Sequence, residues 1–272
     1  LKGPASVLYG RGSSGGIINR VTKKPFDREQ AEVSTTIGTY GVKRVEGDIN
    51  TPITDNVAFR ITGAKEDSGG FRKEYFLDRT FVAPSIKLTP SENTDIILQL
   101  EHLDDRRLND FGVPAVNRRP ADVSSKTYYG SSKGSRDDYI QTRISAGTLT
   151  FEHRFNEDVK IRNATRYYDY DFDRNDTLAT AVGTGVNPLV TRLKGSVQRQ
   201  EIGLFNQTEL ALKTRAMGFE HNVLFGVEVA HQDKDLQRYA LPTPPKVRLY
   251  NPTLTPLSRD RLKTTINNNG VS

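Results

Sequence analysis

Apolar and polar residues alternate in short segments over most of this sequence. The clearest segment is 219–231, in which Phe219, Phe225 and Val227 alternate with polar or small residues such as Glu228. A period of two matches a β-strand, because successive side chains of a strand point to opposite faces. The pattern therefore predicts strands with one apolar face and one polar face.

Segments of this kind recur about nine times along the chain. We expect strands at residues 31–39, 42–50, 57–66, 80–88, 95–101, 139–155, 159–169, 197–212 and 219–231. In the third of these strands, Phe59 and Ile61 face one way while Arg60 faces the other. Pro84 falls inside the fourth strand, and because proline donates no hydrogen bond to a sheet, we expect a bulge or a strand end there.

Short turns and long polar connections alternate between these strands. The turns are expected at 51–56, 89–93, 156–158 and 215–218, and the long connections at 104–138, 172–196 and 232–272. Outer-membrane β-barrels have brief turns at one end and extended loops at the other. A soluble β-sandwich has no reason to gather its long loops at one end, so this alternation favours a barrel.

The composition fits a barrel and gives no support to a helical membrane protein or a nucleic-acid-binding protein. Hydrophobic residues make up 35% of the sequence, and no run of about 18 apolar residues is present, which excludes a membrane-spanning helix. A barrel with a wet interior needs apolar residues only at alternate positions. The net charge of +6 comes from basic residues spread among 33 acidic ones, so no basic patch indicates nucleic-acid binding. The absence of cysteine fits an oxidising compartment but decides little.

The first 25 residues contain the spacing Gly10-x-Gly12-x-x-Gly15, which also occurs in dinucleotide-binding loops. Such loops need a following helix, whose N-terminus meets the pyrophosphate. Residues 17–22 are rich in β-branched side chains and predict a strand instead, and no Lys-Ser or Lys-Thr pair follows the glycines. Glycine permits positive φ and close backbone approach, so we expect a tightly packed turn rather than a nucleotide site.

The opening segment as a whole resembles a known family. Leu1-Lys-Gly-Pro-Ala-Ser-Val-Leu-Tyr-Gly-Arg-Gly-Ser-Ser-Gly-Gly-Ile-Ile-Asn-Arg-Val-Thr-Lys-Lys-Pro25 is similar to the end of the plug domain of TonB-dependent siderophore receptors, most closely the ferrichrome-type, hydroxamate-linked branch. Three further stretches resemble recurring phrases of the same receptors: Tyr75-Phe76-x6-Ala83-Pro84-Ser85, Glu152–Asn156 and Leu249–Pro252.

The resemblance implies an all-β fold: a partial transmembrane antiparallel β-barrel with about nine of an expected 22 strands, preceded by the C-terminal piece of a plug domain. Residues 1–26 are expected to be the last part of the plug, and residues 27–272 the first part of the barrel. An open sheet in lipid leaves unsatisfied edges. We therefore expect a fragment, or a truncated product, of a larger receptor, and expect this piece alone to be inactive.

The function implied by the resemblance is uptake of a ferric siderophore across the bacterial outer membrane, energised through TonB, without enzymatic chemistry. The expected partners are the ferric siderophore, TonB (through a TonB box upstream of this sequence) and outer-membrane lipid and lipopolysaccharide, but not nucleic acid. No cofactor is expected, because iron enters as part of the ligand. The alternative is a passive porin-type channel, which has no plug.

A ferric siderophore is bulky, partly apolar and rich in oxygen acceptors, so aromatic and arginine side chains suit it. The stretch Phe111–Pro114 resembles the stretch that reaches the ligand in ferrichrome-type receptors. The expected ligand contacts are Phe111, Tyr128, Tyr129, Tyr170, Phe172 and Tyr239. For each of these residues, the alternative is loop packing or a place in an interfacial aromatic girdle.

The remaining candidate residues concern plug packing, metals and acidic pairs. The residues expected to pack the plug are Gly3, Gly10, Arg11, Gly12, Gly15 and Gly16, with Arg11 paired to acidic residues of the barrel wall. The four histidines have neither the spacing nor the cysteine partners of a metal site, so none is expected. The pairs Asp104-Asp105 and Asp137-Asp138 are expected to be solvated loop ends.

Overall fold

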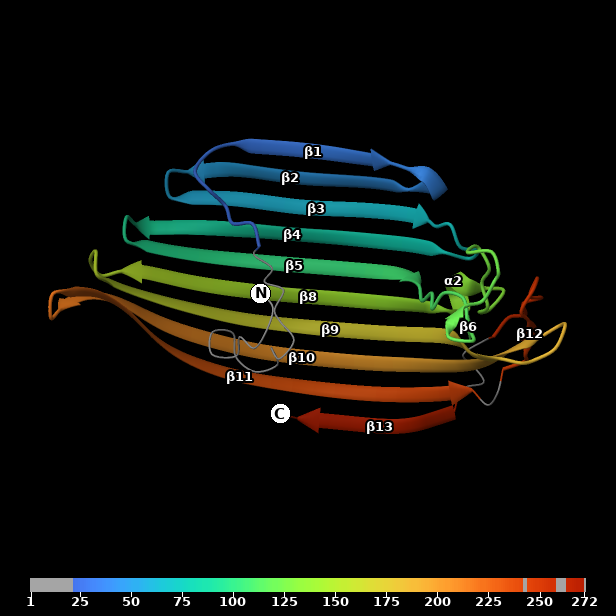
Figure 1. Ribbon diagram of the computed structural model, residues 1–272. Helices are drawn as coiled ribbons and strands as arrows, with labels where there is room; N and C mark the ends of the chain where they lie inside the picture. Colours follow the sequence, from blue (N-terminus) through green and yellow to red (C-terminus); the bar gives the residue numbers. More distant parts are fainter. Residues whose placement is uncertain (1–21, 242–243, 258–262, 272) are drawn as a thin grey trace.

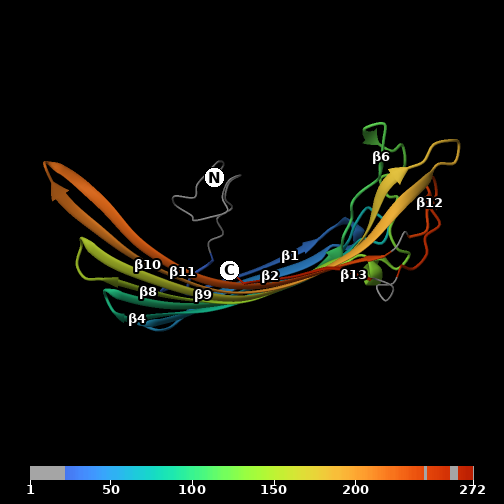
Figure 2. The same cartoon turned by 90° about the horizontal axis from the view of Figure 1, so that it is seen from below.

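The computed structural model describes residues 22–241, 244–257 and 263–271. Within these residues the chain forms an eleven-stranded, wholly antiparallel sheet in which sequence neighbours are mostly spatial neighbours (Figure 1). The sheet is strongly curved and has a concave and a convex face (Figure 2). The all-β prediction is confirmed.

The nine predicted strands are all present. The long strands are β1 (Gln30–Ile37), β2 (Lys43–Thr54), β3 (Val57–Gly69), β4 (Phe76–Ser91), β5 (Thr94–Leu108), β8 (Tyr139–Arg154), β9 (Val159–Val182), β10 (Leu189–Ala216), β11 (Phe219–Leu241) and β13 (Lys263–Val271). The short elements are η1 (Thr39–Gly41), β6 (Ala115–Val116), β7 (Arg119–Pro120), α2 (Gly134–Asp137) and β12 (Val247–Arg248). Among the described residues, no helix is long and apolar enough to cross a membrane.

The strands β9 and β10 extend well beyond their predicted ends. Residues 172–182 and 189–196, which the sequence assigned to a long polar connection, continue these two strands, so that prediction was wrong. The prediction of a long connection over 232–272 was wrong as well, because residues 232–241 continue β11 and β13 lies within the same stretch. Residues 172–182 carry polar residues on both faces, such as Asp173 and Arg174, and so lack the alternation that marks the other strands.

The pairing of the strands separates the side chains by face. Residues directly opposite in an antiparallel pair point to the same side, so the registers carry each face across the whole sheet. The convex face bears exposed apolar side chains on β2, β5, β8, β10 and β11: Ile49, Leu98, Leu149, Phe151, Leu204, Phe225, Val227 and Val229. Val227, for instance, is 67% exposed. A continuous apolar band of this kind is typical of a sheet that faces lipid.

Pro84 lies in the middle of β4, and the expectation of a bulge or strand end there was wrong. It pairs with Ile61 of β3 without any shift of register. On its other side β4 pairs with β5, and there Ala83 and Pro84, between the paired residues Val82 and Ser85, have no partner in the ladder. The missing N–H of the proline therefore faces β5, and the strand accepts one local gap instead of a bulge.

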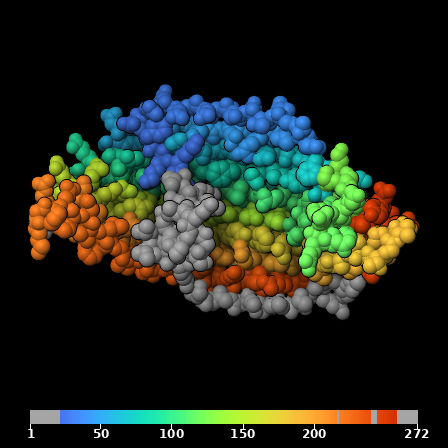
Figure 3. Space-filling model, viewed as in Figure 1, coloured from blue at the N-terminus to red at the C-terminus, as the bar shows by residue number. Residues whose placement is uncertain are grey.

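A small hydrophobic core lies at the end of the sheet where the long loops gather. Its buried members are Ala121, Tyr129, Val190, Val247 and Leu249, and they come from the connection between β5 and β8, from β10 and from the segment around β12. Figure 3 shows this loop end, where the green 109–138 connection lies next to the yellow end of β9 and β10. Loops that are far apart in the sequence pack against the ends of β9 and β10 to form this core.

The two faces of β11 provide a test. We expect Val227→Lys, on the convex face, to lower the free energy of unfolding of the full-length protein in lipid vesicles by about 2–4 kcal/mol, because it places a charge in the hydrocarbon layer. The matched change Glu228→Lys, one residue along on the concave face, should cost less than about 1 kcal/mol. Urea titrations measure both values. Equal costs for the two variants would contradict the assignment of the faces.

Candidate functional site on the concave face

The segment that leads into β1 is bound to the concave face by side chains of β2 and β3. Asp48 accepts a hydrogen bond from Lys23 Nζ at 2.6 Å and from Arg60 Nε and Nη2 at 2.9 and 2.7 Å. The remaining nitrogen of the guanidinium, Arg60 Nη1, donates to the Lys24 carbonyl at 2.9 Å. One carboxylate thus holds two cations, one from the segment and one from the wall. Arg60 thus lies on the face opposite to that of Phe59 and Ile61, as the alternation predicts.

Asn50, on the same face of β2, binds the main chain of this segment. Its Oδ1 accepts from the Phe26 N–H at 3.1 Å, and its Nδ2 donates to the carbonyls of Phe26 at 2.9 Å and Arg28 at 2.6 Å. The guanidinium carbons of Arg28 and Arg60 lie 5.3 and 5.1 Å from the centroid of the Phe26 ring, within cation–π range. Because Asn50 is buried, leaving these main-chain groups without it would be costly.

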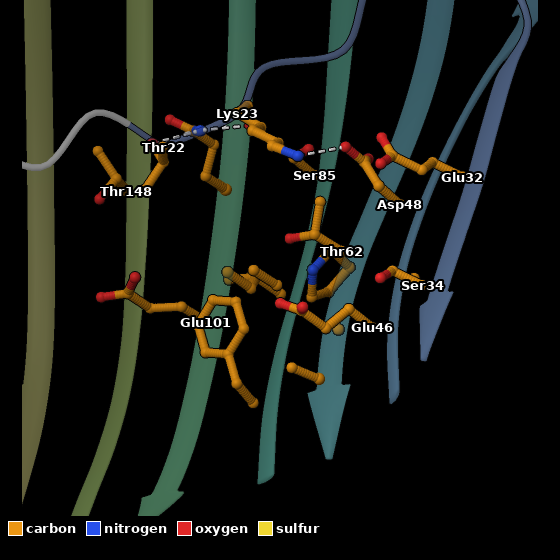
Figure 4. A pocket seen from close by; sticks show the side chains of 18 of the residues that line it. Thr22, Lys23, Glu32, Ser34, Glu46, Asp48, Thr62, Ser85, Glu101 and Thr148 are labelled. Carbon is orange, nitrogen blue, oxygen red and sulfur yellow. Dashed lines mark hydrogen bonds and ion pairs between the residues drawn. The ribbon is translucent and has the colours of Figure 1, made fainter. Parts of the chain in front are cut away.

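Further along the sheet, Gln99 of β5 completes the attachment. Its Nε2 donates to the Thr22 hydroxyl at 2.7 Å and to the Lys23 carbonyl at 3.2 Å. Beside this contact lies a hollow of about 460 Å³, whose acidic lining residues include Glu32, Glu46 and Glu101 (Figure 4). Arg166 also lines it and pairs with Glu101 at 2.5 Å. The residues expected to pack the plug (Gly3, Gly10, Arg11, Gly12, Gly15 and Gly16) lie outside the described residues.

Two of the predicted ligand residues, Tyr170 and Phe172, lie side by side on the concave face of β9. Their ring centroids are 6.2 Å apart, and the rings are nearly parallel, with an interplanar angle of 10°. Arg199 of β10 lies over both rings, with its guanidinium carbon 4.6 Å from the Tyr170 centroid and 5.5 Å from the Phe172 centroid. The sequence reasoning missed Arg199, because only the register of β9 and β10 brings it opposite Phe172.

The structure does not bring all the predicted residues together. Phe111 lies in the connection after β5 with its ring half-exposed. Tyr239, on β11, shares a face with Gln237, to which its hydroxyl donates, and this is the face opposite to that of Arg199. No observation here tests ligand contact for these residues, which stays a prediction.

Tyr128 and Tyr129 are buried among the loops. The Tyr128 hydroxyl donates to Asp138 at 2.6 Å, and the Tyr129 hydroxyl donates to the Leu249 carbonyl at 2.7 Å. Burial, with a smaller effect of the Asp138 charge, raises the pKa of Tyr128 above its usual value, and burial raises the pKa of Tyr129 to about 12. This geometry fits the alternative role, loop packing, and presents neither ring to a ligand in this structure.

Asp137 and Asp138 are buried, so the expectation of a solvated loop end was wrong. Asp138 pairs with Lys194 of β10 at 2.7 Å, and both side chains are fully buried. It also accepts from the Ser131 N–H at 2.6 Å and the Thr177 hydroxyl at 2.7 Å. Burial acts to raise the pKa of Asp137, but hydrogen bonds from Arg136, Ser131 and the Leu257 N–H outweigh it and hold that pKa below its usual value.

Arg192, near the start of β10, joins two loop segments through their carbonyl groups. It donates to the carbonyls of Tyr129 and Gly130 at 3.1 and 2.9 Å, and twice to that of Pro245, at 2.9 and 2.7 Å. Together with Lys194, it fixes the 109–138 connection and the segment around β12 to the end of the sheet. No local signal in the sequence marks either residue, because their partners are more than fifty residues away.

The second acidic pair and the histidines also lie on strands. Asp104 and Asp105 belong to β5, and Asp105 is buried and accepts from Arg79 at 2.5 Å, so the pair is not a loop end. His102 shares a hydrogen bond of 2.9 Å with Ser145. In the described part of the chain, no group of three or more His, Asp or Glu residues is placed to hold a metal ion.

Comparison with known proteins gives relatives over nearly the whole chain, although no family model matches it. Over 96% of its length, the chain is 30% identical to the probable TonB-dependent receptor BfrD of Bordetella pertussis, of which it covers 37%. Over 61% of its length, it is 34% identical to the metal-pseudopaline receptor CntO of Pseudomonas aeruginosa, of which it covers 23%. The chain thus matches 37% of the length of BfrD and 23% of the length of CntO.

A solved structure has the same fold. The open form of the ferric-catecholate import receptor Fiu from Escherichia coli K12 matches 97% of this chain with a TM-score of 0.85, at 23% sequence identity. The match covers 43% of that receptor. The curved sheet described above therefore has the fold of part of a receptor barrel, which confirms the predicted partial barrel.

The attachment of the N-terminal segment can be tested at Asn50. In the full-length protein, Asn50→Ala should raise the hydrogen-exchange rate of the Phe26 amide by about tenfold or more, because its acceptor is lost. Asn206→Ala is the matched control, since the partners of Asn206 among the described residues, Asn163 and Thr165, lie on neighbouring β9. Unchanged exchange at Phe26 in Asn50→Ala would contradict the proposed attachment.

The buried ion pair can be tested by removing one charge. Lys194→Met leaves Asp138 buried without its cation, and we expect a loss of about 3–5 kcal/mol in the free energy of unfolding. The control is Lys65→Met, which breaks a half-exposed pair with Asp78 and should cost at most about 1 kcal/mol. Denaturant unfolding of the full-length protein compares the two. A cost for Lys194→Met no greater than for Lys65→Met would show that the buried pair contributes nothing.

Proposed function

We propose that this chain, which belongs to the TonB-dependent siderophore receptor family, is part of an outer-membrane receptor that takes up a ferric siderophore. The observation that supports this function best is the docked segment 22–28. It lies on the polar concave face of a sheet whose convex face is apolar. A segment held inside a curved sheet is the arrangement required of a plugged transporter.

We also propose the division of the chain that the sequence predicts. Residues 1–26 form the last part of the plug, and residues 27–272 the first part of the barrel. The hydrogen bonds of Asp48, Asn50 and Arg60 to residues 23–28 support a boundary here, because β1 begins immediately afterwards, at Gln30. These contacts would keep the end of the plug attached to the wall during transport.

In this proposal the protein binds and moves its ligand but performs no chemistry on it. The ferric siderophore enters from the loop end and meets the concave face. Energy supplied through TonB acts on the plug upstream of Thr22, so two distant sites are coupled. The convex apolar band contacts lipid, and lipopolysaccharide adjoins it on the outer side.

The chemical class of the siderophore is a separate question from the function. The opening residues predict a ferrichrome-type, hydroxamate ligand. Two of the relatives are receptors for other ligands: CntO for metal-pseudopaline and Fiu for ferric catecholate. These ligands belong to those proteins, and the ligand proposed for this chain is a ferric siderophore.

Iron uptake in a strain that lacks the receptor tests this function. We expect deletion of the gene to abolish TonB-dependent uptake of radioactive iron from at least one ferric siderophore, and the intact gene to restore it. A passive porin predicts the opposite pattern: uptake that persists without TonB, and a large steady conductance of the purified full-length protein in planar bilayers. Either of these two results would contradict the proposed function.

A further inference from the structure

Acidic and basic residues of β9, β10 and β11 are distributed unequally between the two faces of the sheet. This holds for the part of each strand that lies towards the long loops. Pairing of Phe172 with Arg199, and of Arg199 with Leu236, fixes which residues share the concave face. The acidic side chains of the convex face are Asp169, Asp171, Asp173, Asp233 and Asp235. The basic side chains of the concave face are Arg174, Arg199, Lys234 and Arg238. We name these four residues, with Tyr170 and Phe172, the basic aromatic wall.

The cations of this wall outnumber the acids around them. Over the same stretch of β9, β10 and β11, the concave face carries two acidic residues, Asp176 and Glu201. Asp176 is paired with Arg174 at 3.3 Å. Glu201 accepts hydrogen bonds from the Tyr168 hydroxyl at 2.7 Å and from Gln232. The acidic residues are thus engaged, and the wall keeps an excess of positive charge.

Arg199 is the residue of the wall best placed to meet a ligand. Its side chain is 32% exposed, and its nearest carboxylate oxygen, on Glu201, is 3.9 Å away, beyond hydrogen-bond distance. Within the described residues, its Nε is buried without a hydrogen-bond acceptor. The two rings beneath hold the guanidinium in place, which reduces the conformational entropy that binding would cost.

We infer that the basic aromatic wall is a ligand-contacting surface and that it selects an anionic ferric chelate over a neutral one. The inference rests on the proposed function and adds the charge of the ligand. Charged chelate oxygens accept strong, charge-assisted hydrogen bonds from a guanidinium, and the aromatic rings supply apolar contact area. A neutral ferric trihydroxamate gains little from the excess charge. The acidic residues on the same strands lie on the other side of the sheet and do not repel the ligand at contact distance.

The experiment uses the full-length receptor and two probes of opposite class: a trianionic ferric triscatecholate and a neutral ferric trihydroxamate. Arg199→Gln should weaken binding of the triscatecholate about tenfold, which corresponds to ~1.4 kcal/mol, and leave any binding of the trihydroxamate unchanged. Lys234→Gln, at an exposed position, should act in the same direction. Arg143→Gln is the matched control, because it removes the same charge from the convex face of β8, and it should leave both affinities unchanged.

Calorimetric titration separates the outcomes. Tighter binding of the trihydroxamate than of the triscatecholate would overturn the inference about charge and leave the proposed function standing. Equal effects of Arg199→Gln, Lys234→Gln and Arg143→Gln would overturn the role of the wall. If neither probe nor any other ferric siderophore bound the receptor, both the inference and the proposed function would fail.

Discussion

The constraint on which this structure depends is that a strand presents two faces, and that in a membrane these faces meet different media. Backbone N–H and C=O groups find no partners in hydrocarbon, so each strand must pair with its neighbours. Once the strands are paired, the period of two alone decides which side chains meet lipid and which line the interior. Phe225 and Glu228 lie on the same strand, yet they belong to opposite environments.

The sheet has only a small hydrophobic core, so the segments attached to it are positioned by polar contacts. On the concave face, Asp48 and Asn50 bind the segment that precedes β1 through both side-chain and main-chain groups. At the loop end, Lys194 and Arg192 tie two distant connections to β10. In both places the buried polar groups named have several hydrogen-bond partners, which is the condition under which burial is tolerated. These polar contacts therefore fix the positions of the segment before β1 and of the long loops, which strand pairing does not determine.

The sequence predicted strands correctly where one face of the strand is apolar, and it did not predict them where both faces are polar. β11 was predicted from its start because Phe225, Val227 and Val229 alternate cleanly with polar or small residues. The outer parts of β9 and β10 were taken for loops, since charged residues occupy both of their faces there. Tyr170 and Phe172 were chosen as candidates by residue type, but their contact with Arg199 depends on strand register, which no local pattern encodes.

The central claim is that the convex face meets lipid and the concave face meets water, and it can be measured directly because the chain contains no cysteine. Single cysteines placed in turn at positions 223–230 of β11 in the full-length receptor, in membranes, would be treated with a charged maleimide. The account predicts labelling with a period of two, strong at Glu228→Cys and absent at Val227→Cys. Uniform labelling along the segment, or labelling with the opposite phase, would contradict it.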